Sequence, residues 1–267
     1  MTALIGPRDA PDVHVMTFNI RRRMQHTRRS SPDLWAKRAP ALRELLRVEQ
    51  PALVGIQEAL PDQGRFVRKS LGEHYRRLGH GRNADGSGEG CPIYLDTRRF
   101  ELLQWGQLAL SDTPHEPGSK TWGNMIPRVL VMARLGDRAT GSELVFINTH
   151  FDHRSRRSRV KAATLVSSLS GDATIITGDF NTAVDTSPFA EFARDGFHDT
   201  WDSAPRRLTA EWGTYPNYRA PKLDRKRIDW ILAGRRIEAS EVGINVARYG
   251  GIAPSDHLPV QAVVRVV

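Results

Sequence analysis

The chain has 267 residues and a formal charge of +9, from 39 Lys and Arg against 30 Asp and Glu. Its 39% hydrophobic and 26% charged residues are typical of a folded globular protein, which excludes collagen, coiled coil and intrinsic disorder. No apolar run approaches the ~18 residues of a membrane span, and residues 1–15 lack the pattern of a signal peptide. These features predict a cytoplasmic protein with no membrane association.

The excess of positive charge favours an anionic partner such as nucleic acid, a phosphorylated metabolite or an anionic lipid surface. A solvated basic face without a partner accounts for the charge equally well. Cys91 is the only cysteine, so an intramolecular disulfide and a cysteine metal cluster are excluded. Its place before a predicted strand is typical of an inert thiol, and no segment indicates a protein partner.

The first part of the chain predicts a strand, a helix and a second strand, after a flexible tail over residues 1–11. Residues 13–19 alternate apolar and polar side chains, which is the pattern of a strand. Residues 33–49 carry leucines at helical spacing until Pro51 ends the helix. Residues 53–58 predict a buried strand, and a short helix is expected after Pro61.

The middle of the chain predicts strands joined by loops. The segment 79–90 contains five glycines and is the most loop-like of the chain. No long helix separates the strands that follow, so an antiparallel sheet is expected. The predicted strands are 93–95, 100–110, 129–135 and 144–148.

The last part repeats the order of the first. An Arg-rich helix over 155–169 leads to a strand at 174–177 and a helix at 187–194, and strands follow at 228–232 and 259–266. No linker rich in Pro or Ser divides the chain. We therefore expect one α/β domain over residues 1–267, built from two similar halves packed sheet to sheet.

Polar side chains recur at the carboxyl ends of these strands or just beyond them, where ligands bind in α/β folds. Taken singly, each has an ordinary explanation as a turn residue or a hydrogen-bonded filler. Together they form an oxygen-rich set without a thiolate, which favours Mg²⁺ or Mn²⁺ over zinc. Such a metal polarises a phosphoryl oxygen, so the set predicts phosphoester hydrolysis. Its members are Asn19, Glu58, His150, Asp179, Asn181, Asp256 and His257.

Asp229 lies between Ile228 and Trp230 in an otherwise apolar strand. Burying a carboxylate there requires a cationic or hydrogen-bonding partner. His257 would supply that partner.

Six short motifs in this order resemble the endonuclease/exonuclease/phosphatase superfamily, which has the DNase I-like fold. The resemblance implies a four-layer α/β/β/α sandwich with two central, mainly antiparallel sheets and a site at one edge of them. The motifs are Thr17-Phe18-Asn19, Gly55-Ile56-Gln57-Glu58, Asn148-Thr149-His150, Gly178-Asp179-Phe180-Asn181, Arg227-Ile228-Asp229-Trp230 and Ser255-Asp256-His257.

The resemblance also implies a role for each motif residue. Glu58 would be the principal metal ligand, with Asn19 and Asp256 beside it. Asp179 would hold the attacking water and deprotonate it, and Asn181 would orient that water or a phosphate oxygen.

The two histidines would donate to the scissile phosphate, with His257 backed by Asp229. Family members have been interpreted with either the Asp or the His–Asp pair as the general base, and both stay open here. By the same resemblance, Glu89 would brace His150, fix its tautomer and favour its cationic form.

Further residues are expected to contact the substrate. The run Pro117-Gly118-Ser119 with Trp122, and His150-Phe151-Asp152-His153, are similar to a bacterial branch of uncertain substrate, while the same strands resemble deadenylase-type exonucleases. This resemblance implies that the loop 111–128 covers the rim of the metal site, with Trp122 as a wall and Arg128 near a phosphate. The alternative is that Trp122 only anchors the loop on the protein body. The other expected substrate contacts are Asp152, His153 and Arg157. Gly213-Thr214-Tyr215-Pro216 departs from the Thr-Phe-His or Thr-Phe-Asn of relatives.

Three functions are therefore considered. The first is a metal-dependent phosphodiesterase for nucleic acid or a nucleotide, which the basic charge and the arginines after His150 favour. The second is a phosphatase for a small phosphorylated metabolite, sugar or lipid head group. The third is a binding module that has lost its chemistry, and it would predict gaps in a set that is in fact complete.

Overall fold

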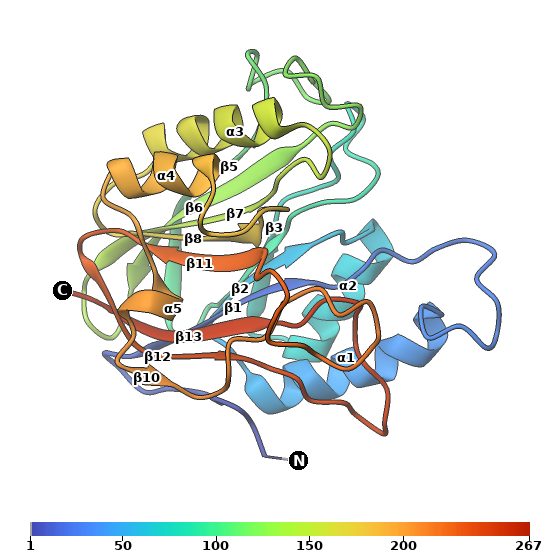
Figure 1. Ribbon diagram of the computed structural model, residues 1–267. Coiled ribbons are helices and arrows are strands. Elements are labelled where there is room, and N and C mark those ends of the chain that lie inside the picture. The colour runs from blue at the N-terminus through green and yellow to red at the C-terminus, as the bar shows by residue number, and fades with distance from the viewer. Residues whose placement is uncertain (1) are drawn as a thin grey trace.

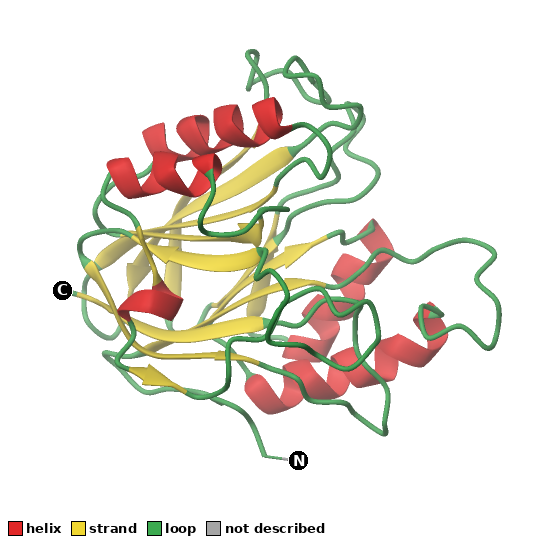
Figure 2. Cartoon of the chain, in the orientation of Figure 1, coloured by secondary structure: helices red, strands yellow, loops and turns green. Residues whose placement is uncertain are grey.

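Two β-sheets pack face to face at the centre of the computed structural model, which describes residues 2–267 (Figure 1). Helices α1 (Trp35–Glu49) and α2 (Pro61–Leu71) cover the outer face of one sheet, while α3 (Arg156–Ser168) and α4 (Ser187–Arg194) cover the other. Figure 2 shows the strands enclosed between these two helical layers. The predicted four-layer α/β/β/α sandwich of the DNase I-like fold is confirmed.

The seven-stranded sheet has the order β10-β12-β13-β1-β2-β4-β3, and the six-stranded sheet has the order β5-β6-β7-β8-β11-β9. A short helix, α5 (Thr200–Ser203), follows β9. The strands of the first sheet are β1 (Val13–Asn19), β2 (Leu53–Gln57), β3 (Tyr75–Leu78), β4 (Ile93–Asp96), β10 (Arg206–Arg207), β12 (Ile237–Ile244) and β13 (Val260–Val266). Those of the second are β5 (Phe100–Ala109), β6 (Val129–Asp137), β7 (Glu143–His150), β8 (Thr174–Asp179), β9 (His198–Asp199) and β11 (Asp229–Ala233).

Each sheet contains a strand–helix–strand unit with parallel strands, β1-α1-β2 in one and β7-α3-β8 in the other. The carboxyl ends of these four strands meet at one edge of the sandwich. Strands β13 and β11 run antiparallel to β1 and β8, so their amino ends reach the same edge. This arrangement gathers residues from six strands at a single place.

The two sheets do not coincide with the two halves of the chain. Strand β4 pairs with β2 and β3 of the first sheet, whereas β5 begins the second sheet, so the predicted run of hairpins is interrupted there. The last strand, β13, returns to the first sheet between β1 and β12. Strand β12 escapes sequence prediction because Glu238, Ser240 and Glu241 obscure its apolar alternation.

A buried polar network joins the inner faces of the sheets below the site. The side-chain nitrogen of Asn148 on β7 donates to the carbonyl groups of Ile56 and Cys91, at 2.8 and 3.0 Å. Its side-chain oxygen accepts from Gln57 Nε2 at 2.7 Å and from Thr177 Oγ1 at 3.1 Å. Because these groups are buried and bonded to each other, they hold the two sheets in one register.

The expected flexible tail over residues 1–11 is instead attached to the body in part. The backbone amides of Leu4, Ile5 and Gly6 donate to the Glu49 carboxylate, and Ile5 is buried. Met1 lies outside the described residues. A sequence pattern misses this contact because Glu49 belongs to the end of α1, more than forty positions away.

None of the helices in residues 2–267 combines the length and hydrophobicity that a membrane crossing requires.

A substitution at Gly55 tests how closely the two sheets pack. A Cβ atom at this position would lie 2.5 Å from Asn148 Oδ1 and still closer to Thr177 Oγ1. We expect Gly55→Ala to lower the free energy of unfolding by about 1–3 kcal/mol through overpacking. Gly106→Ala on β5 is the matched control, because nothing lies within 4 Å of the added Cβ. Chemical denaturation measures both variants, and equal stability of the two would contradict the explanation.

Candidate active site

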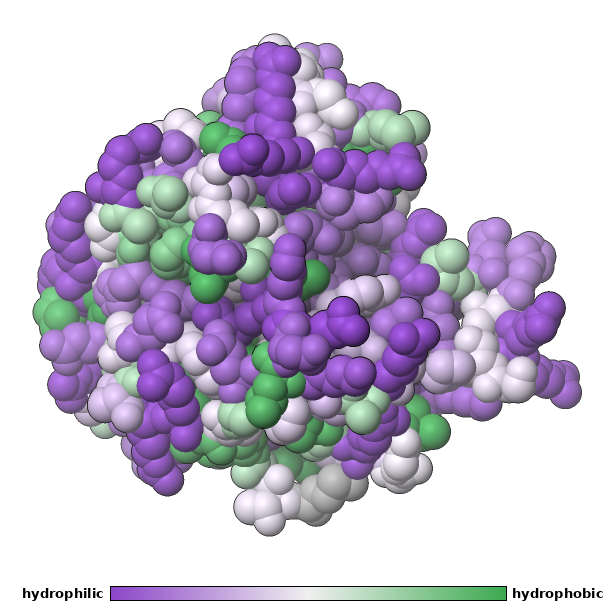
Figure 3. Space-filling model, in the orientation of Figure 1, coloured by the Kyte–Doolittle hydropathy of each residue, from purple (hydrophilic) through white to green (hydrophobic). Residues whose placement is uncertain are grey.

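A pocket opens at the edge where the six strand ends meet. Figure 3 shows mostly hydrophilic residues on this view of the molecule, with hydrophobic ones in small scattered groups. Nine of the residues predicted from sequence line the pocket: Glu58, Glu89, Arg128, His150, His153, Asp179, Asn181, Asp256 and His257. Residues that lie more than 150 positions apart in the chain are thus brought together.

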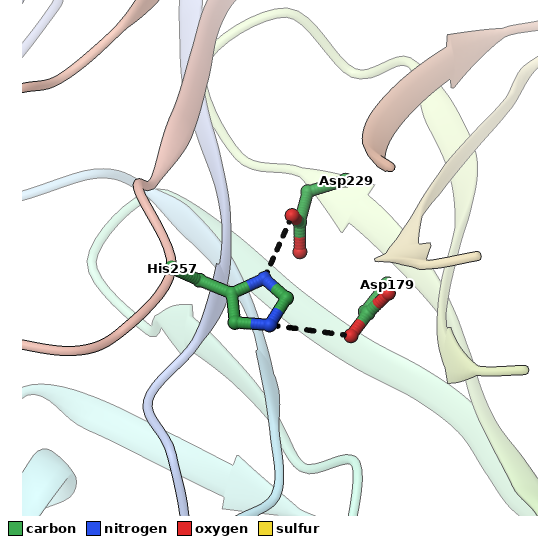
Figure 4. Close-up of side chains that lie close together, drawn as sticks. All are labelled: Asp179, Asp229 and His257. Carbon is green, nitrogen blue, oxygen red and sulfur yellow. Dashed lines mark hydrogen bonds and ion pairs between the residues drawn. The ribbon is translucent and has the colours of Figure 1, made fainter. Parts of the chain in front are cut away.

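Two buried carboxylates face each other across the pair β8–β11, where Asp179 lies opposite Asp229. His257, from the loop before β13, lies between them (Figure 4). Its Nδ1 is 2.9 Å from Asp229 Oδ2, and its Nε2 is 3.8 Å from Asp179 Oδ2. The hydrogen bond predicted between His257 and Asp229 is therefore present.

This arrangement changes the protonation of both partners. Burial and the nearby Asp229 carboxylate raise the pKa of Asp179 to about 7. Burial alone would lower the pKa of His257, but the carboxylates of Asp229 and Asp179 raise it to about 10. At neutral pH the imidazole of His257 therefore carries a proton, while Asp179 is close to its titration point.

The second histidine lies on the other side of Asp179, with His150 Nε2 3.4 Å from Asp179 Oδ2. The expectation that Glu89 braces His150 and favours its cationic form is wrong. The Glu89 carboxylate instead pairs with Arg82 at 2.9 Å and with Arg22 at 3.2 Å. Burial, together with the charges of Arg128 and Arg82, holds the pKa of His150 well below its ordinary value, so this imidazole is neutral.

The oxygen ligands predicted for a cation lie beside this cluster. The side chain of Asn19 donates to Glu58 Oε1 at 3.1 Å and to Asp179 Oδ2 at 3.0 Å. Glu58 and Asp256 both lie within 4 Å of the guanidinium of Arg21. Two carboxylates gathered in this way have the chemistry that a hard divalent cation requires, whereas the amide oxygen of Asn19 accepts from the Arg21 backbone amide at 3.0 Å.

The backbone places Glu58 in the pocket, because it follows β2 with a left-handed φ of 61° that turns the chain. Burial would raise the pKa of Glu58, yet hydrogen bonds from Asn19 and from the Arg22 amide, together with the charges of His257 and Arg21, keep it below its ordinary value. Glu58 is therefore ionised at neutral pH.

A second cluster of buried side chains, one histidine and two aspartates, could also hold a metal ion. The ligand atoms of Asp179, Asp229 and His257 all lie within 4.8 Å of one another. A protonated imidazole has no free lone pair, however, and Nδ1 of His257 is already engaged with Asp229. The donor set around Glu58 fits a cation better than this group does.

Asn181 follows β8 in a left-handed conformation, with φ 52°. Its backbone amide donates to Asp179 Oδ1 at 3.0 Å, and its side-chain nitrogen donates to the Phe151 carbonyl at 3.0 Å. These bonds fix both Asn181 and the carboxylate beside it.

Three residues predicted to contact the substrate do not line the pocket. Trp122 is only 4% exposed, packs in the core under α3, and donates from Nε1 to Asp112 at 2.7 Å. Asp152 is buried and accepts from the amides of Arg154 and Ser155. Arg157 is exposed on α3. Trp122 therefore anchors the loop 111–128, whose last residues alone reach the pocket.

Six lining residues were missed by sequence reasoning: Arg21, Arg22, Arg82, Ile126, Tyr215 and Ile228. Two signals pointed to some of them. A run of three arginines follows Asn19 and Ile20, and Tyr215 stands in the loop that departs from the motif of relatives. The Tyr215 ring lies 4.8 Å from that of His257. Arg82 gave no signal, because it stands in a glycine-rich loop without a recognisable motif.

The protonation of His257 depends on Asp229. Asp229→Asn removes the charge that holds the imidazole proton, so the pKa of His257 should fall below that of the unmodified protein. Titration of the histidine resonances by NMR in metal-free protein measures the change. Asp199→Asn provides a matched control. Asp199 is also a buried carboxylate, but its partner is Arg227 and not His257. An unchanged titration of His257 in Asp229→Asn would refute the coupling.

Comparison with known proteins supports the same fold and chemistry. The model of the Endonuclease/Exonuclease/phosphatase family matches residues 16–257. A search of curated protein sequences found no match.

Solved structures resemble the chain over almost its whole length. An endonuclease/exonuclease/phosphatase family protein from Bacteroides thetaiotaomicron has 27% identity and a TM-score of 0.88, over 96% of this chain and 98% of that one. A mannosyl-6-phosphatase of Bacteroides thetaiotaomicron VPI-5482 has 27% identity and a TM-score of 0.87, over 94% and 99%. The human Nocturnin catalytic domain, at 18% identity and a TM-score of 0.72 over 96% and 94%, shares the fold.

Proposed function

Since the chain belongs to the endonuclease/exonuclease/phosphatase family, whose members are phosphoester hydrolases, we propose that it removes the phosphate of a small phosphorylated molecule with the aid of Mg²⁺ or Mn²⁺. The observation that carries this proposal is the composition of the pocket wall. Charged and polar side chains dominate it, and Tyr215 is the only Phe, Tyr or Trp among its lining residues. The likeness to the mannosyl-6-phosphatase, at 27% identity, supports the same class of substrate.

A divalent cation would be held by the carboxylates of Glu58 and Asp256, with Asn19 beside them. When bound, it would polarise a phosphoryl oxygen and offset the charge that builds up in the transition state. Arg21, which lies near both carboxylates, would favour their ionised forms and hold them close together.

Asp179 is the best candidate for accepting a proton from the attacking water. A general base works best with a pKa near the working pH, and the pKa of about 7 meets that condition. His257 already carries a proton at neutral pH, so it would donate to a phosphate oxygen rather than act as the base. The neutral His150 would donate a second hydrogen bond from Nε2 or would accept one there, depending on its tautomer.

Hydrolysis of a phosphodiester in nucleic acid or a nucleotide is the second candidate. The net charge of +9 and the four arginines that line the pocket favour it, because phosphate contacts dominate the affinity for nucleic acids. Trp122 and Arg157 do not line the pocket, so neither supports a polynucleotide substrate.

The metal requirement is tested with chelator and a ligand variant. Hydrolysis should vanish in EDTA and return with Mg²⁺ or Mn²⁺, and Glu58→Gln should raise the metal concentration needed for half-maximal rate by about 10-fold or more. Glu143→Gln, an exposed glutamate on β7, is the control. Full activity after exhaustive dialysis against EDTA would exclude the proposed chemistry.

The substrate class is tested by measuring kcat/KM with Mg²⁺ and Mn²⁺ over two groups of compounds. Hexose 6-phosphates and nucleoside monophosphates represent small phosphomonoesters, while single- and double-stranded DNA and RNA represent diesters. We expect the highest kcat/KM for a member of the first group. Faster cleavage of DNA or RNA would establish the second candidate instead.

A further inference from the structure

Part of the pocket wall has no role in the chemistry described so far. It consists of Arg22, Arg82, Glu89, Arg128 and His153, and we call it the arginine wall. Its members come from loops after β1, before β4, before β6 and after β7. Glu89 was expected to bind His150, yet its carboxylate forms ion pairs with two arginines of this wall instead.

The arginine wall is fixed relative to the metal ligands. Gly90, next to Glu89, forms a backbone bridge with Ala59, next to Glu58, with hydrogen bonds of 2.9 and 3.2 Å. The amide of Arg82 donates to the Glu89 carbonyl at 2.9 Å, so these two residues also share a backbone link. Charged groups that are held by backbone pairing are in place before a ligand arrives, which reduces the entropy lost on binding.

The guanidinium of Arg128 has hydrogen-bond donors without a partner among the described residues. It is 4% exposed, and its Nε and Nη1 atoms have no hydrogen-bond partner among the described residues. Its Nη2 donates to His153 Nδ1 at 3.1 Å, which leaves the proton of a neutral His153 on Nε2. The Asp152 carboxylate lies 3.5 Å from Arg128 Nε and partly offsets its charge.

Both carboxylate oxygens of Glu89 already pair with arginines of the wall, one with Arg22 and the other with Arg82. Three guanidinium groups and one imidazole N–H are therefore accompanied by only two nearby carboxylates, Glu89 and Asp152. A hydroxyl group needs an acceptor as well as a donor, whereas phosphate and carboxylate groups need donors alone. The free hydrogen-bonding capacity of this wall suits an anion.

We propose that the arginine wall binds a second anionic group, a phosphate or a carboxylate, on the same substrate whose scissile phosphate lies at the metal ligands. This inference rests on the proposed function, since it names the kind of molecule that the phosphoesterase takes. The preferred substrate is then a doubly anionic compound, and a simple monophosphate binds more weakly.

Binding of inorganic phosphate to metal-free protein tests the wall without hydrolysis. Calorimetry in EDTA should show that Arg82→Met raises the phosphate Kd by about 10- to 100-fold, the range expected for loss of a charged hydrogen-bond donor. Arg22→Met should act in the same direction, and because the Arg22 side chain is exposed, this change leaves the core intact. Arg265→Met, on β13 at the far end of the strand from His257, is the control and should bind phosphate as the unmodified protein does.

Glu89→Gln gives a result of opposite sign. Removing the negative charge from between two arginines should lower the phosphate Kd, because the wall gains net positive charge. A raised Kd would mean that Glu89 itself supports the ligand, which would overturn the proposal. An unchanged Kd in Arg82→Met and Arg22→Met would overturn it as well.

Matched substrates then identify the second group. The ratio of kcat/KM for 3-phosphoglycerate over glycerol 3-phosphate tests a carboxylate, and the ratio for glucose 1,6-bisphosphate over glucose 6-phosphate tests a phosphate. At least one ratio should exceed about 10 and should shrink in Arg82→Met. Ratios near one would reject a doubly anionic substrate. If no compound is hydrolysed, the proposed function fails, while the phosphate titrations still decide whether the arginine wall binds anions.

Discussion

Two carboxylates buried side by side repel each other, and the site exists because a cation is held between them. Asp179 and Asp229 occupy paired positions on neighbouring strands, so the sheet itself forces them together. The imidazolium of His257 relieves the repulsion from one side, and the amide of Asn19 relieves it from the other. Burial and the neighbouring charges raise the pKa values of both Asp179 and His257. Shifted pKa values of this kind are what acid–base chemistry needs.

That arrangement spans both sheets, so it depends on how closely they pack. Asn19 and His257 belong to the first sheet and its loops, whereas Asp179 and Asp229 belong to the second. The network around Asn148 fixes the distance between the sheets just below the pocket. A small shift of one sheet against the other would separate groups that now lie about 3 Å apart. The fold therefore supports the site through its core as much as through its loops.

The sequence predicted those parts of the site that strand patterns locate. Asn19, Glu58, His150 and Asp179 stand at the ends of clearly apolar strands, and the topology brings those ends together. Loops gave poorer predictions, since nothing local tells whether a side chain such as Trp122 points into the core or into a pocket. The partner of Glu89 was also missed, because Arg22 and Arg82 reach it from separate loops.

The insertion of β13 between β1 and β12 has a consequence for the order of assembly during translation. The ribosome releases β1 well before β13, its neighbour on one side. Until then β1 offers an unpaired edge, which is prone to association with other chains. Asp256 and His257 directly precede β13, so a chain that still lacks this segment has no complete site. The unpaired edge of β1 and the incomplete site of such a chain thus have one structural origin, the place of β13 in the sheet.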